Sequence, residues 1–147
     1  MIKEQSDEFW MQKAFEEAEK ALDKEEVPVG AIVIYKEQII GRGHNMTETF
    51  NDVTAHAEIQ AITAASNTLG SKYLEGCKIY ITLEPCCMCA GALYWARPSK
   101  VIFGARDEKR GAGRYNGIYH PKTKIQSGIL EEPCAELIRK FFHEKRK

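Results

Sequence analysis

His56, Cys86 and Cys89 have the types and the spacing that zinc sites use. The two cysteines lie three positions apart at an expected helix start, so both sulfur atoms face the same side of the first turn. The free N–H groups and the positive pole of that turn favour the thiolate, which is the form that binds zinc. The sequence offers no second Cys pair or Cys/His pair at similar spacing. Three protein ligands leave a position open for water, so the pattern predicts one catalytic Zn²⁺ per chain rather than a four-ligand structural site.

Glu58, two positions after His56, is the candidate for moving protons. In a regular helix this offset turns two side chains about 200° apart, which suits two ligands on one metal poorly. A helix start is looser, so Glu58 can reach a zinc-bound water, take its proton and later donate it to the substrate and leaving group. Taken alone, His-x-Glu is equally an ordinary first turn with an acid near the helix dipole. The occurrence of His-x-Glu together with Pro85-Cys86-x-x-Cys89 is what favours a catalytic role for Glu58.

The other three cysteines are expected to play no part in the metal site. Cys87 points to another side of the turn that carries Cys86. Cys77 and Cys134 stand alone and are expected to be buried as small apolar residues. Three cysteines within positions 86–89 of a cytosolic chain indicate metal binding or catalysis rather than a disulfide framework.

Apolar periodicity and turn residues predict the elements that must position these side chains. Ser6 is the expected N-cap of a first helix that continues to about Lys24. Further helices are predicted at 55–66, 85–96 (opened by proline) and 131–145, strands at 31–35, 39–44, 77–83, 100–104 and 122–126, and loops at 45–54 and 106–121. Because strands alternate with helices after an opening hairpin, this order predicts an α/β fold with a mixed, five-stranded sheet.

Length, hydropathy and charge restrict the class of protein. The 147 residues suit a single domain, expected to span 1–147. No apolar run approaches the roughly 20 residues of a membrane helix, and residues 1–12 lack the apolar core of a secretory signal, so we expect a cytoplasmic protein without a membrane partner. The net charge is zero, but basic residues gather at 106–114 and 139–147. Each cluster is either a solvated segment or a contact for phosphates.

Longer motifs extend the pattern beyond the metal ligands. They read VPVGA at 27–31, TAHAE at 54–58, TLEPC at 82–86, MCAGA at 88–92 and FGARD at 103–107. Together with the His-x-Glu and Pro-Cys-x-x-Cys signature, they resemble the zinc-dependent nucleoside and nucleobase deaminases. Within that class the chain is similar, over nearly its whole length, to the bacterial tRNA-specific adenosine deaminases.

This resemblance implies a three-layer α/β/α cytidine-deaminase-like fold and a homodimer whose interface helps form the active site. It implies hydrolytic conversion of adenosine to inosine at the wobble position of a tRNA anticodon loop, with the base flipped into the pocket. It assigns substrate contacts to Asn45, Val29, Ala57 and Glu84. The Asn45 amide would read the base edge, although the same residue is also an ordinary turn residue, and Val29 would form an apolar wall. Segment 111–120 departs from the family's pattern.

Two other functions are consistent with parts of the sequence. The first is deamination of guanine or another free nucleobase or nucleotide on the same fold, because the stretch from Leu93 to Pro98 is also similar to guanine deaminases. Trp95 in that stretch is equally explained as a core or dimer-interface residue. The second is a zinc-stabilised RNA-binding module without catalysis, which leaves Glu58 and the open ligand position without a role.

Overall fold

A computed structural model describes residues 3–145, so Arg146 and Lys147 of the basic cluster at 139–147 lie outside the described residues. The elements follow in the order α1 (Asp7–Asp23), β1 (Gly30–Tyr35), β2 (Gln38–His44), α2 (Thr47–Phe50), α3 (Ala57–Leu69), β3 (Lys78–Leu83), α4 (Cys87–Ala96), β4 (Lys100–Ala105), the 3₁₀ turn η1 (Ala112–Arg114), β5 (Lys124–Ser127) and α5 (Glu131–Lys145). The sheet order is β2-β1-β3-β4-β5. β1 pairs antiparallel with β2 and β3, whereas β3, β4 and β5 run parallel, so the sheet is mixed as predicted.

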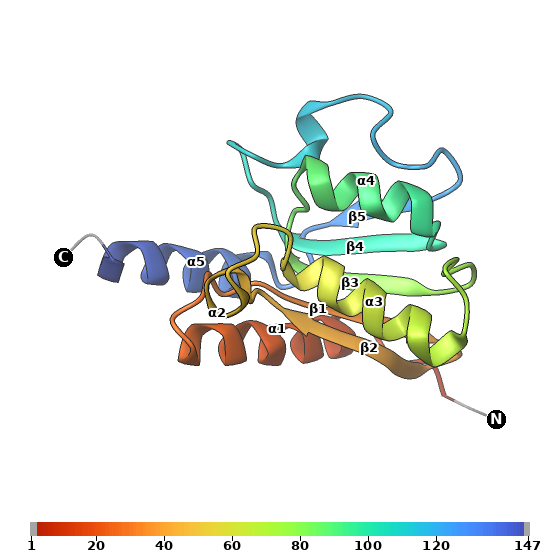
Figure 1. Ribbon diagram of the computed structural model, residues 1–147, viewed down its shortest axis with the longest axis horizontal. Coiled ribbons are helices and arrows are strands. Elements are labelled where there is room, and N and C mark those ends of the chain that lie inside the picture. The colour runs from red at the N-terminus through yellow and green to blue at the C-terminus, as the bar shows by residue number, and fades with distance from the viewer. Residues whose placement is uncertain (1–2, 146–147) are drawn as a thin grey trace.

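Helices cover both faces of this sheet (Figure 1). α3 and α4 pack on one face and α1 and α5 on the other, and each face has its own apolar core. Along β1, Ala31 and Val33 point to the α3 side while Ile32 and Ile34 point to the α1 side. Strands buried on both faces need apolar residues throughout, which explains the unbroken apolar run of this strand. The predicted three-layer α/β/α fold is confirmed.

Element boundaries differ from the predictions mainly beside the site. The expected helices at 55–66 and 85–96 begin at Ala57 and Cys87, so Pro85 precedes its helix instead of opening it. Trp95 was expected in the core or in a dimer interface, and its 67% exposure makes the core placement wrong. No helix in the described part of the chain combines the length and the apolar character needed to cross a membrane.

The predicted loop at 45–54 contains the short helix α2, which a buried carboxylate holds in place. Glu26 accepts hydrogen bonds from the backbone N–H of Glu48 (3.1 Å) and of Thr49 (2.7 Å), and from the Thr49 hydroxyl (2.7 Å). Burial by itself would raise the pKa of Glu26, but these hydrogen bonds outweigh it and lower the pKa below its usual range. Four residues are too few for a periodic signal, so this tertiary contact explains why the sequence pattern missed α2.

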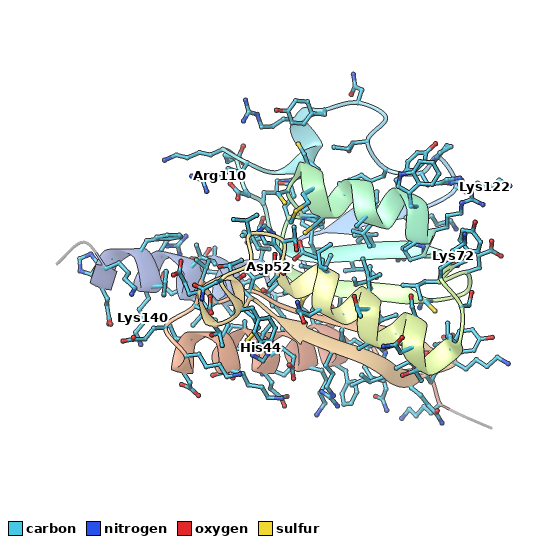
Figure 2. The ribbon with its side chains drawn as sticks, in the orientation of Figure 1. His44, Asp52, Lys72, Arg110, Lys122 and Lys140 are labelled. Carbon is cyan, nitrogen blue, oxygen red and sulfur yellow. The ribbon has the colours of Figure 1, made fainter. Side chains whose placement is uncertain are left out.

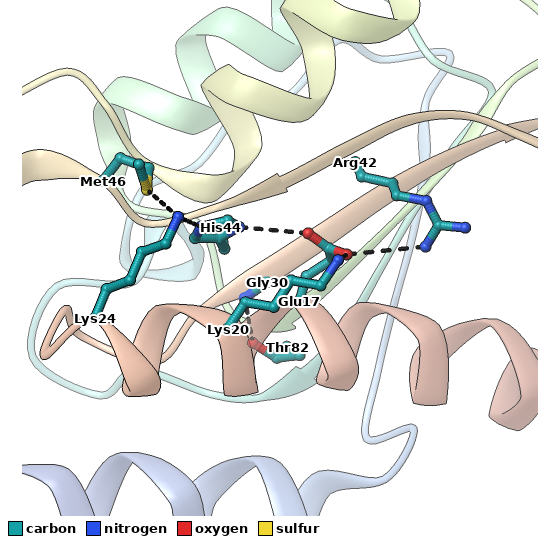
Figure 3. A network of polar contacts seen from close by, with 8 residues as sticks. All are labelled: Glu17, Lys20, Lys24, Gly30, Arg42, His44, Met46 and Thr82. Atoms are coloured by element: carbon teal, nitrogen blue, oxygen red, sulfur yellow. Dashed lines mark hydrogen bonds and ion pairs between the residues drawn. The ribbon is translucent and has the colours of Figure 1, made fainter. Parts of the chain in front are cut away.

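A second buried carboxylate, Glu17 on α1, joins that helix to β2 (Figure 3). It accepts a hydrogen bond from Lys20 at 2.6 Å, forms an ion pair with Arg42 at 3.8 Å and lies 3.4 Å from Nδ1 of His44. Lys20, Arg42 and His44 thus give the buried Glu17 carboxylate polar partners in place of water. The contact fixes the carboxyl end of β2, which leads directly into Asn45.

On its other face, β2 touches the backbone of α3 through two glycines, Gly41 and Gly43. A Cβ atom on Gly43 would lie 2.3 Å from the carbonyl oxygen of Ala57 and 2.6 Å from the amide nitrogen of Ala61. Backbone atoms cannot yield at such distances, so only glycine lets the first turn of α3 lie against the strand. That turn carries the predicted site residues.

We expect Gly43→Ala to lower the free energy of unfolding by about 2 kcal/mol or more, because the new methyl displaces the start of α3. Zinc content should fall with it. Gln38→Ala, an exposed change at the start of β2, should change stability by less than about 1 kcal/mol. Urea unfolding and metal analysis of both variants test this, and an unchanged Gly43→Ala variant would contradict the close packing.

Candidate zinc centre and pocket

The three predicted ligands meet although His56 lies thirty residues before the cysteines. The Nδ1 atom of His56 is 3.7 Å from the Sγ atom of Cys86 and 3.5 Å from the Sγ atom of Cys89. Tetrahedral zinc holds sulfur at about 2.3 Å and imidazole nitrogen at about 2.0–2.1 Å, which places such ligand atoms about 3.5 Å apart. The observed spacing and the donor set therefore fit Zn²⁺ with three protein ligands.

Two helix starts provide these ligands. His56 is the N-cap of α3 and Cys86 the N-cap of α4, and both have extended backbones. Neither side chain caps its own helix, so both are free to turn toward the metal position. Cys89 occupies the first turn of α4 and is fully buried. An N-cap residue is not bound by helical side-chain directions, so Glu58 can share a site with His56 despite the two-residue spacing.

The two thiols differ in their readiness to ionise. The pKa of Cys86 is lowered to about 3 by a hydrogen bond from the Cys89 thiol, against the effect of burial, with further help from His56. The hydrogen bond that Cys89 donates, together with burial, raises the pKa of Cys89. One proton is thus held between the sulfurs of Cys86 and Cys89 without metal, and zinc binding would release it.

Glu58 lies in the first turn of α3 and is 4% exposed. Burial raises its pKa to about 7, against its own backbone hydrogen bond and the nearby His56. A carboxyl group that gains and loses a proton near neutral pH, beside a metal position, has the properties of a general acid and base.

A cavity of about 650 Å³ opens over this group, and it is of the size that small-molecule sites have. All the residues assigned by resemblance line it, namely Asn45, Val29, Ala57 and Glu84, beside His56, Glu58 and Cys86. Asn45 is 7% exposed, and its carboxamide oxygen lacks a hydrogen-bond partner among residues 3–145. A buried acceptor without a partner costs free energy, so it points to a donor on a bound ligand.

The cavity wall also contains residues that the sequence reasoning did not assign to the site. They are Val27, Thr47, Leu83, Asp107, Glu108, Ile138 and Phe142. Ile138 and Phe142 come from α5, where they belong to an apolar stripe at helical spacing. No local signal separates a stripe residue that packs on the sheet from one that reaches the pocket, because both have the same periodicity.

The two basic clusters have different surroundings. Arg106, Lys109 and Arg110 line the cavity, and Figure 2 shows Arg110 projecting from the segment after β4. On α5, Arg139 is paired with Glu132 and Glu136 along its own helix. The first cluster is therefore placed to meet a charged ligand, whereas Arg139 is largely neutralised within its helix.

The remaining cysteines lie as expected. Cys87 is exposed and Cys77 and Cys134 are buried. Burial raises the pKa of Cys77 to about 11 and that of Cys134 to about 12, so both remain thiols at neutral pH.

These environments predict a stepwise thiol titration. A water-soluble thiol reagent should modify one thiol, Cys87, in the zinc-loaded native protein, and Cys87→Ser should remove that reaction. Chelation of zinc should add Cys86, whose partly exposed sulfur the metal no longer protects, while the buried Cys77, Cys89 and Cys134 stay slow until the chain unfolds. A count that does not rise after chelation would contradict the ligand assignment.

Comparisons with known proteins agree with this arrangement. Residues 4–105 match the family described as the cytidine and deoxycytidylate deaminase zinc-binding region. The tRNA-specific adenosine deaminase of Bacillus subtilis is 44% identical over 147 residues, covering 96% of this chain and 91% of that protein.

Two solved structures are also similar. One comes from work on A-to-I editing by tRNA:A34 deaminases at the wobble position of transfer RNA; it has a TM-score of 0.82 and 39% identity and covers 88% of this chain and 98% of that chain. The other is guanine deaminase from Bacillus subtilis, with a TM-score of 0.67 and 38% identity, covering 69% of this chain and 66% of that chain. The chain therefore belongs to the cytidine and deoxycytidylate deaminase family of zinc-dependent hydrolases, among the relatives of the tRNA-specific adenosine deaminases.

Proposed function

We propose that this protein deaminates adenosine to inosine at the wobble position of a tRNA anticodon loop. The observation that carries the proposal is the combination of a zinc ligand set beside buried Glu58 with a cavity that Arg106, Lys109 and Arg110 help to line. Relatives that span nearly the whole chain and are named for this activity support the same substrate. Family membership in a class of hydrolases argues against the non-catalytic zinc-stabilised RNA-binding module.

Zinc, when held by His56, Cys86 and Cys89, supplies an open position at which water becomes acidic near neutral pH. The chain's own part in the reaction is proton transfer by the Glu58 carboxylate. It accepts the proton that the attacking water loses and delivers it to the purine ring nitrogen. It then takes the proton of the hydroxyl now attached to the ring and passes it to the amino group, which leaves as ammonia. The raised pKa of Glu58 suits both directions of this transfer.

We propose that Asn45, Val29 and Ala57 hold the base. The partnerless carboxamide oxygen of Asn45 would accept a hydrogen bond from the base edge. Val29 and buried Ala57 provide apolar surface for its ring. The cavity accommodates a base only after it has left the stack of a loop, as base-modifying enzymes require.

A tRNA substrate would explain the basic residues that line the cavity. Arg106, Lys109 and Arg110 would contact phosphates on either side of the flipped nucleotide and hold the strand without reading its sequence.

A homodimer is proposed as well, with the exposed Trp95 of α4 in its interface, since large exposed apolar side chains mark such surfaces. A single domain acting on tRNA would work in the cytoplasm.

Glu58→Gln should lower the deamination rate by at least about 10²-fold, because an amide cannot move the proton. Zinc should remain at about one per chain, since Glu58 is not a ligand. Glu19→Gln, an exposed change on α1, is the matched control and should keep full activity. Rates measured beside metal content test this, and loss of zinc from Glu58→Gln would give Glu58 a different role.

The substrate is tested by a panel of an anticodon stem-loop with adenosine at the wobble position, free adenosine, free guanine and free cytidine. We expect inosine in the stem-loop and ammonia release from free compounds at least about 100-fold slower, because only RNA reaches the basic residues that line the cavity. Rising salt should weaken the RNA reaction. Turnover of free guanine with none on RNA would support the alternative, a guanine or other nucleobase deaminase, which the similarity to a guanine deaminase structure favours.

A further inference from the structure

Glu84 is a buried carboxylate in the cavity wall, and both of its oxygens are engaged by the main chain. It lies between the end of β3 and the ligand Cys86, and it is 6% exposed. Its Oε1 atom accepts a hydrogen bond from the N–H of Asp107 at 2.9 Å, and its Oε2 atom one from the N–H of Gly113 at 2.8 Å. These two donors come from opposite ends of one segment, 107–113.

Further backbone contacts fasten the same segment beside the zinc ligand. The N–H of Glu84 donates to the carbonyl of Ala105 at 2.8 Å, and the N–H of Ala112 donates to the carbonyl of Pro85 at 2.8 Å. Cys86 and Gly111 form an isolated antiparallel bridge. The segment thus wraps around the Glu84 side chain, which fills the centre of the loop.

Two glycines make this wrapping possible. A Cβ atom on Gly111 would lie 2.3 Å from Oε1 of Glu84, and one on Gly113 would lie 2.5 Å from Oε2. Neither glycine has a positive φ, so each is required for space rather than for backbone freedom. At Gly113 the carboxylate is the group that a methyl would strike; the next neighbour, Arg106 Nη1, is 3.9 Å away.

The held segment carries Lys109 and Arg110, two of the basic residues that line the cavity, beside the acidic Asp107 and Glu108. Asp107, whose N–H is fixed by Glu84, in turn accepts hydrogen bonds on its own carboxylate from the N–H groups of Lys109 (3.2 Å) and Arg110 (3.0 Å). The direction in which these cations project therefore follows from the position of Asp107. A loop with no such anchor would sample many conformations and lose conformational entropy on binding.

We propose that Glu84 is a positioning residue, whose carboxylate holds segment 107–113 so that its basic side chains face the substrate. It serves the pocket through the loop rather than by a bond to the base. The kinetic part of this inference rests on the proposed function, while the anchoring itself can be measured without any substrate.

The anchoring is tested by amide hydrogen exchange in the zinc-loaded protein. The N–H groups of Asp107 and Gly113 should exchange about tenfold faster or more in Glu84→Gln than in the unchanged protein. Glutamine is no conservative substitute here, because its amide nitrogen would face one of the two donors. Glu75→Gln, an exposed change in the turn that precedes β3, is the control and should leave both amides protected. Unchanged exchange in Glu84→Gln would overturn the proposal.

The effect of this anchoring on substrate binding is tested by deamination kinetics on the anticodon stem-loop. In Glu84→Gln we expect KM to rise about tenfold and kcat to change by less than about threefold, with zinc content unchanged. A fall in kcat at constant KM would place Glu84 at the reacting atoms instead. If neither variant nor unchanged protein deaminates RNA, the proposed substrate is wrong, and the exchange result still decides the anchoring.

A double-mutant cycle guards against simple misfolding. Gly113→Ala leaves the carboxylate chemically intact but pushes it from its partner, so it should raise KM as Glu84→Ala does. Both changes break the same contact. The KM of the double variant Glu84→Ala/Gly113→Ala should therefore exceed that of the more affected single variant by no more than about twofold. Fully additive effects on KM would show that the two positions act separately and would overturn the proposal.

Discussion

The zinc ligands depend on two helix N-termini meeting beside the sheet with their donor atoms 3.5–3.7 Å apart. Each helix contributes an N-cap residue, His56 or Cys86, whose extended backbone frees the side chain from helical geometry. The approach of α3 is possible because Gly41 and Gly43 present no side chain to it. A metal site of this kind therefore rests on the packing of a helix on a strand as much as on the ligands themselves.

Four buried glutamates show how the fold separates structural carboxylates from a reactive one. Glu17 is surrounded by cations, Glu26 by the amides of α2, and Glu84 by the amides of segment 107–113. Each charge has partners that compensate for the loss of water. Glu58 is buried with less compensation, and its pKa is raised to about 7. Burial with little compensation therefore leaves Glu58 able to exchange a proton near neutral pH.

The pocket is assembled from segments that are distant in the chain. Thr47 comes from α2, Phe142 from α5 and Arg110 from the segment after β4, and the candidate ligands His56 and Cys86 line the cavity as well. Buried carboxylates hold two of these walls, since Glu26 fixes α2 and Glu84 fixes the basic segment. A cavity lined by Val29 and Asn45, with Arg106, Lys109 and Arg110 in the same lining, is complementary to a base that is attached to a phosphate chain.

The sequence by itself determined the chemistry and the fold class. The candidate ligands His56, Cys86 and Cys89 and the proposed proton carrier Glu58 are readable because zinc chemistry demands particular side chains at short local spacings. The α/β order is readable because strands and helices have different periodicities.

Only the tertiary structure decided what fills the pocket wall and what holds it. α2 is too short for a periodic signal, Phe142 has the same apolar pattern as any stripe residue, and the partners of Glu84 lie 23 and 29 residues away. Such contacts depend on which backbone groups the folded chain brings to a buried carboxylate, and this leaves no local trace in the sequence.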